Sequence, residues 1–196
     1  MGSERLGLAV VLRSSFALAA SARDSAQATA QPHEPATIAA FEATLAAHDS
    51  ATEALRSWCE ARGLASSAQI MARPVAGAAA RQPKELRRLL GMGAHEALGY
   101  RHVELTCGKH VLSVAHNWYL PGRLTAEMNT ALAETQLPFG RIAAPLAYRR
   151  EPLEIMSKPP RGCPANTITA HRALLRLPDG RPLAYVLECY TSHNLE

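Results

Sequence analysis

An arginine near the start of a predicted β-hairpin is the first residue in this sequence that could do chemistry. Residues 100–121 contain two runs rich in Val, Leu, Tyr and Trp, joined by a Cys-Gly-Lys turn, which predicts two antiparallel strands. Alternation places Arg101 on the same face as the apolar residues that follow it. A buried guanidinium needs acceptors for its donors. Arg101 is therefore a candidate for binding an anionic ligand, and an ion pair with Glu104 or Glu96 is the alternative.

A glutamate in the last predicted strand, residues 182–191, is the second candidate. Both faces of this strand are largely apolar, so we expect it to lie in the centre of the sheet with Glu188 poorly solvated. A carboxyl group in such a place tends to keep its proton, as a general acid requires near neutral pH. The alternative is an ion pair between Glu188 and Arg172 on the neighbouring strand.

The elements that must position these two residues include both helices and strands. Apolar spacing and turn signals predict helices at 38–48, 51–63, 83–90 and 125–135, a strand at 67–75, an extended segment at 142–156, and hairpins at 100–121 and 168–191. Asp49-Ser50 supplies a cap before the second helix, and its free N–H groups could hold an anion. This order favours the α+β class, with a single antiparallel sheet and helices packed on one side.

Composition narrows the class of protein. A chain of 196 residues fits one domain, which we place at 35–196 behind an extension at 1–34. The net charge of +4 favours anionic partners slightly, but no dense Lys/Arg block interleaved with aromatic residues indicates nucleic-acid binding. No run approaches the roughly 18 apolar residues of a transmembrane segment. The four cysteines lack metal-site spacing, so no metal is expected, and Cys59, Cys107 and Cys189 are most simply buried thiols.

Two interpretations of the first 34 residues remain open. An apolar run at 6–12 after Arg5, followed by the small residues at 20–22, is typical of a signal peptide and its cleavage site. Glu4 and Arg13 interrupt that pattern and favour a flexible, Ala/Ser/Gln-rich extension instead. Disulfides are expected only if the chain is exported.

Over roughly residues 41–195, the order of several short segments resembles the chorismate lyase (chorismate pyruvate-lyase) family. The segments are DSAT at 49–52, Arg101 opening a strand, the stretch 115–121 followed by Leu124 and a helix, PFGR at 138–141, REPLEI at 150–155 and the last hairpin with Glu188. None of them is diagnostic alone, and their order carries the resemblance.

The resemblance implies an enzyme without metal or cofactor that converts chorismate to 4-hydroxybenzoate and pyruvate. We expect the protein to be a monomer. The resemblance also implies a buried pocket for this anionic aromatic substrate. Arg101 would hold the ring carboxylate together with the backbone N–H groups of Ala51 and Phe139. Glu188 would act as the acid at the other end of the substrate. A cytoplasmic protein is then expected, because chorismate is made in the cytosol.

An alternative function on the same fold stays open. Ala51 replaces a larger apolar residue of the family, and the spacing around Arg101 and in the last hairpin differs by a residue or two, which on a strand can reverse a side chain. The alternative is a non-catalytic, exported or intracellular binder of a small aromatic carboxylate. The same fold serves as the ligand-sensing domain of some transcription regulators, but no helix-turn-helix is evident in this sequence.

Overall fold

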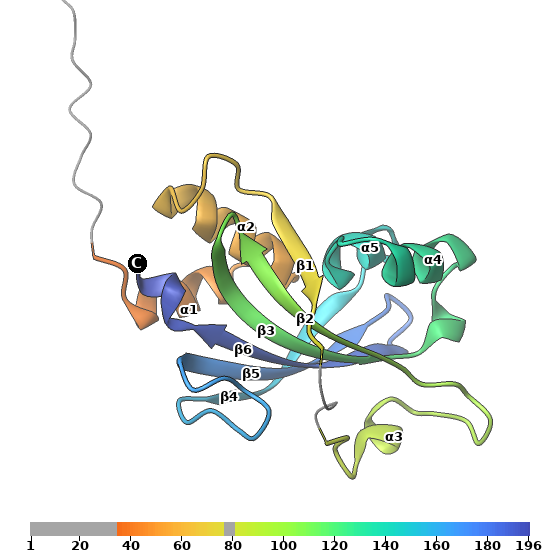
Figure 1. Cartoon of the computed structure of the whole chain (residues 1–196). Coiled ribbons are helices and arrows are strands. Elements are labelled where there is room, and N and C mark those ends of the chain that lie inside the picture. Colours follow the sequence, from red (N-terminus) through yellow and green to blue (C-terminus); the bar gives the residue numbers. More distant parts are fainter. Residues whose placement is uncertain (1–34, 77–80) are drawn as a thin grey trace, which may run out of the picture. The chain divides into compact units, whose positions relative to one another are not determined.

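The computed structural model describes residues 35–76 and 81–196, and its centre is one six-stranded antiparallel sheet (Figure 1). The strands lie in the order β1-β2-β3-β6-β5-β4. Their bounds are β1 Ile70–Pro74, β2 Gly99–Cys107, β3 His110–Tyr119, β4 Arg149–Met156, β5 Thr167–Arg176 and β6 Pro182–Thr191. The last strand therefore lies between β3 and β5 in the centre of the sheet, as its two apolar faces predicted.

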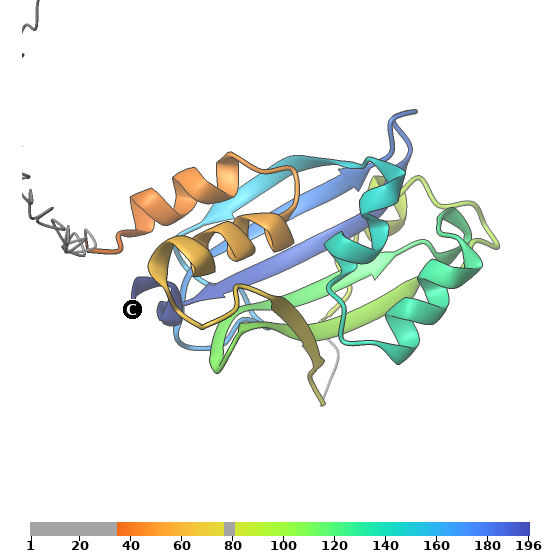
Figure 2. The same cartoon turned by 90° about the horizontal axis from the view of Figure 1, so that it is seen from above.

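The longer helices all cover one face of this sheet (Figure 2). They are α1 Ile38–Ala46, α2 Ala51–Arg62, α4 Ala126–Glu134 and the short α5 Phe139–Ala143. The single turn α3 Leu86–Leu89 lies on the opposite face (Figure 1), and 3-10 turns occur at η1 Pro121–Arg123, η2 Ala144–Leu146 and η3 Ser192–Leu195. This arrangement is the predicted α+β fold with helices packed on one side of an antiparallel sheet.

The predicted N-terminal extension or signal peptide, residues 1–34, lies outside the described residues. Within residues 35–76 and 81–196, no helix is both long enough and apolar enough to cross a membrane.

The corner between α1 and α2 forms where the sequence predicts it. Ser50 occupies the N-cap of α2, and Gly63 ends the helix with a φ of 61°, the left-handed conformation that favours glycine. The Ser50 hydroxyl makes no capping hydrogen bond, and Ala54 is the first residue whose N–H bonds back, to the Ser50 carbonyl at 3.0 Å. The N–H groups of residues 51–53 thus have no partner in the described part of the chain.

Strand alternation in the central hairpin also follows the prediction. Val103 and Leu105 pack in the core beneath α1 and α2, whereas Tyr100 packs against the cluster on the opposite face. Arg101 pairs with Asn117 of β3 and shares the helix-covered face. A register shift follows Leu105, but the extra residue is Leu112 of β3, so Cys107 stays on the same face as Val103 and Leu105.

The segment 142–156 differs from its predicted extended form. Helix α5 and turn η2 occupy residues 139–146, and only the part from Arg149 onward is a strand. Pro138 provides an extended N-cap, and Phe139 and Ile142 are both buried on one side of the short helix. Their spacing of three residues is a helical period, and the sheet-like prediction overlooked it.

The structure pairs all four cysteines, whereas the sequence predicted buried thiols for Cys59, Cys107 and Cys189 unless the chain is exported. Cys59 of α2 bonds to Cys107 at the end of β2, and Cys163 of the β4–β5 loop bonds to Cys189 of β6. The partners lie 48 and 26 residues apart in sequence, so only the tertiary fold brings them together. The Cys59–Cys107 bridge links the helical layer to the sheet, and the Cys163–Cys189 bridge links the β4–β5 loop to the opposite face of the sheet.

Two histidines stack on the face that lacks the long helices. The rings of His102 and His116 are directly paired across β2 and β3, with centroids 4.1 Å apart and planes 19° apart. His116 Nδ1 shares a 2.8 Å hydrogen bond with the Tyr100 hydroxyl, and its Nε2 lies 3.2 Å from the Gly162 carbonyl oxygen. Both ring nitrogens of His102 are buried without a hydrogen-bond partner. Burial lowers the pKa of both histidines.

We expect stability to fall as the pH drops below about 6.5, the ordinary pKa of histidine. The pKa values of His102 and His116 are lower in the folded protein than in the unfolded chain, so the unfolded chain binds protons first as the pH falls. The free energy of unfolding therefore decreases between the histidine pKa of the unfolded chain and the lower pKa values of the folded protein. With two such histidines, the free energy of unfolding should change by at most about 2.7 kcal/mol per pH unit in this range. Urea unfolding across this range would measure it, and His102→Leu should flatten the slope. An equally steep slope in that variant would contradict the prediction.

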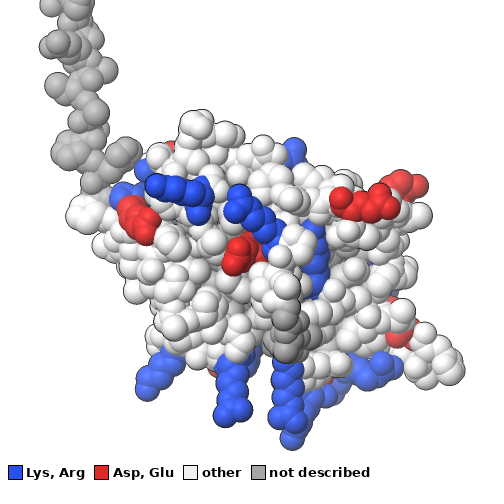
Figure 3. All heavy atoms as spheres, viewed as in Figure 1, with Lys and Arg blue, Asp and Glu red and all other residues white. Residues whose placement is uncertain are grey.

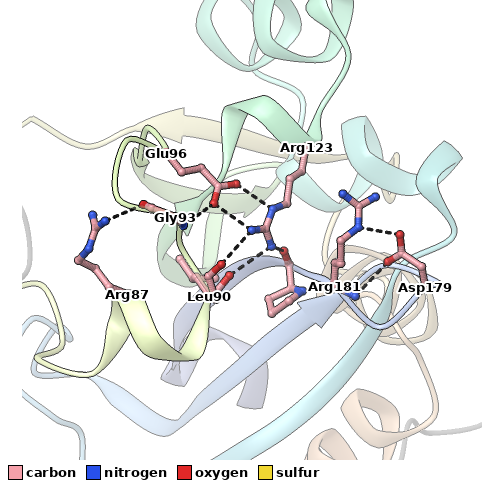
Figure 4. Close-up of polar contacts among 9 residues, drawn as sticks. Arg87, Leu90, Gly93, Glu96, Arg123, Asp179 and Arg181 are labelled. Atoms are coloured by element: carbon pink, nitrogen blue, oxygen red, sulfur yellow. Dashed lines mark hydrogen bonds and ion pairs between the residues drawn. The ribbon is translucent and has the colours of Figure 1, made fainter.

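Arg123 fastens the segment before β2 to the beginning of β6 (Figure 4). Its Nε and Nη2 donate to the two carboxylate oxygens of Glu96 at 2.9 and 3.0 Å. Its Nη1 donates to the carbonyl oxygens of Leu90 and Pro182. Glu96 also accepts a hydrogen bond from the Gly93 N–H at 3.2 Å. Glu96 is therefore committed to Arg123, and the ion pair with Arg101 considered from the sequence does not form.

Basic side chains gather along the lower edge of the molecule in Figure 3, on the side where Figure 1 shows α3. The segment around α3 contributes the exposed residues Arg81, Lys84, Arg87 and Arg88. These exposed side chains give that side of the molecule a basic surface.

Candidate functional site

A small cavity lies against the helix-covered face of the sheet, where α2 and α5 begin. It brings together Ala51, Phe139 and Glu188, three of the four site residues that the family resemblance implied. The rest of its lining consists of Ser50, Thr52, Leu105, Ala115, Asn117, Gly140, Tyr148, Arg150, Leu175 and Val186. The cavity volume of about 30 Å³ has room for one or two water molecules.

One end of this cavity is rich in hydrogen-bond donors. Ser50 Oγ is buried and has no hydrogen-bond partner of good geometry. Asn117 is only 6% exposed, and its amide makes no hydrogen bond within the described residues. The unpartnered N–H groups at 51–53 belong to the first turn of the twelve-residue α2, whose dipole favours negative charge there. This end of the cavity is suited to an anion.

Gly140 leaves space among the hydroxyl groups at this end. A Cβ atom at Gly140 would lie 2.7 Å from Ser50 Oγ, 2.8 Å from Thr52 Oγ1 and 2.9 Å from Tyr148 Oη. Three hydroxyls therefore surround one point that any other residue would fill. Burial raises the pKa of Tyr148, and the nearby Ser50 hydroxyl counters this effect in part, so the phenol stays protonated and can donate.

The other end of the cavity holds a buried ion pair. Arg150 Nη2 donates to Glu188 Oε2, and the Tyr190 hydroxyl donates to the same oxygen at 3.0 Å. The side chains of Arg150 and Glu188 are 10% and 9% exposed. Burial, the largest single effect, lowers the pKa of Arg150, but the charge of Glu188, the Tyr190 phenol and the hydrogen bonds to both together outweigh burial and raise the pKa. Burial, followed by the same carboxylate, raises the pKa of Tyr190.

Glu188 keeps one oxygen available to a ligand. Both of its hydrogen bonds end on Oε2, and Oε1 makes none within the described residues. The poorly solvated position predicted for Glu188 is confirmed, but its partner is Arg150. Arg172, the alternative partner, instead pairs with Glu154 at 2.6 Å. Glu188 can thus accept a hydrogen bond from a ligand while Arg150 holds its second oxygen.

Arg101 lies beside the cavity but outside its lining. Its Nη1 donates to the Leu137 carbonyl oxygen at 2.8 Å and its Nη2 to the Thr135 carbonyl oxygen at 3.0 Å. Burial lowers its pKa, and no carboxylate in the described residues pairs with it. The predicted anionic acceptor is thus replaced by two backbone carbonyls, which fix the segment leading into Phe139. Its predicted contact with a substrate carboxylate stays a prediction.

Comparison with known proteins places the chain in a family. Over 180 residues it is 37% identical to the uncharacterized protein y4mC of Sinorhizobium fredii (strain NBRC 101917 / NGR234), a match that covers 82% of this chain and 76% of the relative. The chain belongs to the y4mC family. No family model matches this y4mC-family chain.

Solved structures share the fold of this chain. PhnF from Mycobacterium smegmatis matches with a TM-score of 0.53 at 13% identity, covering 76% of this chain and 66% of PhnF. The separate effector domain of PhnF matches with a TM-score of 0.51 at 16% identity, covering 74% of this chain and 89% of that domain. The likeness concerns the fold alone, which is the chorismate lyase-like architecture implied by the sequence.

The sequence did not single out Arg150, nor Asn117, Gly140 and Tyr148, as site residues of this y4mC-family chain. Arg150 belongs to β4, an edge strand whose other side chains are mostly exposed. The sequence shows it only as the second of two adjacent arginines in a segment predicted to be extended. Nothing in that pattern marks which arginine turns inward, so its pairing with Glu188 could be seen only in the folded chain.

Proposed function

We propose that this protein binds a small aromatic carboxylate in the cavity between α2, α5 and the sheet. The observation that carries the proposal is that donors without a partner in the described residues, namely the buried Ser50 hydroxyl, the Asn117 amide and the N–H groups of Ala51 and Thr52, line one cavity. Buried donors without a hydrogen-bond partner favour a ligand that offers acceptors, and the N-terminus of α2 favours a ligand with negative charge.

The remaining lining matches the other parts of such a ligand. Leu105, Phe139 and Val186 offer apolar surface to a ring between the two polar ends. Glu188 Oε1 would accept a hydrogen bond from a hydroxyl at the far end of the ring. Arg101 supports the anion indirectly, because a buried guanidinium without a carboxylate partner makes the potential nearby more positive.

The disulfides favour binding over turnover of chorismate. Disulfides form and persist in oxidising compartments, whereas chorismate is made in the cytosol. An exported binder of an aromatic carboxylate is consistent with both bridges. This supports the function considered from the sequence as the alternative to the lyase.

A binding experiment with 4-hydroxybenzoate tests this proposal. Titration calorimetry and thermal unfolding should show saturable binding and a rise in Tm, with benzyl alcohol as a neutral control that does neither. At a ligand concentration of 100 Kd the stabilisation should be about 2.7 kcal/mol. No binding by folded protein, or equal binding of the neutral control, would overturn an anion site.

We expect Gly140→Ala to weaken binding of 4-hydroxybenzoate by at least about tenfold, because its methyl group would occupy the space between three hydroxyls. Gly122→Ala is a matched control, since a Cβ at this exposed glycine of η1 meets nothing within 4 Å. Calorimetry on both variants, with thermal unfolding to confirm folding, makes the comparison. Unchanged affinity in folded Gly140→Ala protein would place the carboxylate elsewhere.

A lyase acting on chorismate is the second candidate, favoured by one observation. Ala51, Phe139 and Glu188 line one cavity, as the resemblance to chorismate lyase implied. In that reaction Glu188 would exchange a proton with the substrate, and its present pairing with Arg150 would have to open. Incubation with chorismate, followed by chromatography for 4-hydroxybenzoate, decides between turnover and binding.

A further inference from the structure

Arg150 stands between the inner cavity and a larger groove on its outer side. The same side chain lines both spaces, so its guanidinium forms part of the wall between them. The inner cavity of about 30 Å³ is too small for an aromatic ring, whereas the outer groove measures about 360 Å³. A ligand of the proposed class therefore needs this wall to move.

The outer groove lies between α1 and the edge of the sheet formed by β4 and β5. Its apolar surface comes from Ala43, Leu45, Ala46, Pro152 and Ile155, and its polar groups besides Arg150 are Glu42, His48, Asp49 and His171. Ile155 is 61% exposed, which is unusual for so large an apolar side chain. The groove thus combines apolar walls with two carboxylates, a lining that suits an apolar group ending in a hydrogen-bond donor.

A chain of contacts links the two spaces. His171 is 4% exposed, and its Nε2 lies 3.0 and 2.9 Å from the two carboxylate oxygens of Glu42. The His171 ring packs edge-on against Tyr190, with centroids 5.1 Å apart, and Tyr190 donates to Glu188. Contacts among Glu42, His171 and Tyr190 therefore hold the back wall of the groove, and Arg150 is the side chain that lines both the groove and the inner cavity.

The Arg150 side chain could also move into a third hollow. It lines this hollow, of about 640 Å³, together with Ala147, Arg149, Glu151, Arg176, Leu177, Pro178 and Gly180. Glu151 offers a carboxylate there, although Arg176 already pairs with it. A guanidinium that leaves Glu188 can thus reach water, beside Glu151 and the two other arginines of this hollow.

We propose that Arg150 is a gate and that the inner cavity and outer groove form one elongated site when it opens. This inference rests on the proposed function and names its ligand class more closely. The ligand is an elongated aromatic carboxylate with a hydrogen-bond donor at its far end. Its carboxylate lies at the start of α2, and its ring passes Glu188 and the position now held by the Arg150 guanidinium. Its donor reaches Glu42 or Asp49 of the groove, whereas the hydroxyl of the shorter 4-hydroxybenzoate would reach only Glu188 Oε1.

Ligand length provides the test at equilibrium. Benzoate and 4-hydroxycinnamate are titrated against the full chain, Ala43→Trp and Ala40→Trp. Ala43 is exposed and lines the groove, whereas Ala40 is exposed on α1 outside it. Ala43→Trp should weaken the binding of 4-hydroxycinnamate by about tenfold or more and the binding of benzoate by less than about twofold. Ala40→Trp should change neither affinity.

Association kinetics test the gate itself. Stopped-flow mixing should show benzoate entering Arg150→Ala about tenfold faster than the parent chain, because no ion pair must open first. If this variant fails to fold, Ala43→Trp should still slow entry of benzoate while leaving its Kd nearly unchanged. Equal entry rates in all folded variants would overturn the gate.

The two proposals fail in different ways. If neither carboxylate binds the parent chain, the proposed function fails, and this inference falls with it. If both bind with affinities that Ala43→Trp leaves equal to those of the parent chain, the binding function stands and the elongated site is wrong.

Discussion

Replacement of Glu188 by alanine should destabilise the protein by about 3–5 kcal/mol, because it leaves a buried guanidinium without its counter-charge. Arg150 is only 10% exposed at its side chain, and no second carboxylate lines the inner cavity. Tyr190, which is fully buried, would also lose the acceptor of its hydroxyl. Urea unfolding monitored by the two tryptophans measures the loss.

A double variant separates the charge effect from simple loss of packing. Arg150→Met combined with Glu188→Leu replaces the ion pair by apolar side chains of similar size, and we expect it to regain most of the stability lost by Glu188→Ala. The same double variant removes the acceptor at Oε1, so it should fold and yet bind 4-hydroxybenzoate poorly. A Glu188→Ala protein as stable as the parent would show that the Arg150 side chain simply turns out to water.

The sequence predicts the fold well wherever local patterns decide it. Alternating residues define both hairpins, and the cap at Ser50 locates the start of α2. The prediction is wrong at 142–146, where two apolar residues three apart form a helix too short for its period to stand out. The cysteine pairs could not be predicted either, because a cysteine in an apolar sequence context looks the same whether or not the fold brings a second cysteine next to it.

The candidate site was predicted less completely, for a reason that the two arginines illustrate. Arg101 was correctly placed on the helix-covered face, but its acceptors are carbonyls of residues 135 and 137, which no strand pattern can anticipate. Arg150 reaches Glu188 from the edge strand, two strands away in the sheet. Alternation along a strand predicts the face on which a side chain lies. The hydrogen-bond partners of a long, flexible side chain depend instead on which groups the tertiary structure brings within its reach.

Removing the Cys59–Cys107 bridge should lower the free energy of unfolding by about 4 kcal/mol, because the bond closes a loop of 48 residues in the unfolded chain. The same relation gives about 3.5 kcal/mol for the 26-residue loop closed by Cys163–Cys189. We expect Cys59→Ala with Cys107→Ala to show the larger loss in urea unfolding without reductant, and Cys163→Ala with Cys189→Ala to show a smaller one.

Reductant provides the control and connects stability to function. The parent chain should lose stability when unfolded with dithiothreitol, whereas the variant lacking all four cysteines should not respond. A parent chain equally stable with and without reductant would mean that its thiols are free and the bridges contribute nothing. That outcome would remove the argument for an oxidising compartment and restore the cytosolic lyase as the stronger candidate, because its substrate is made there.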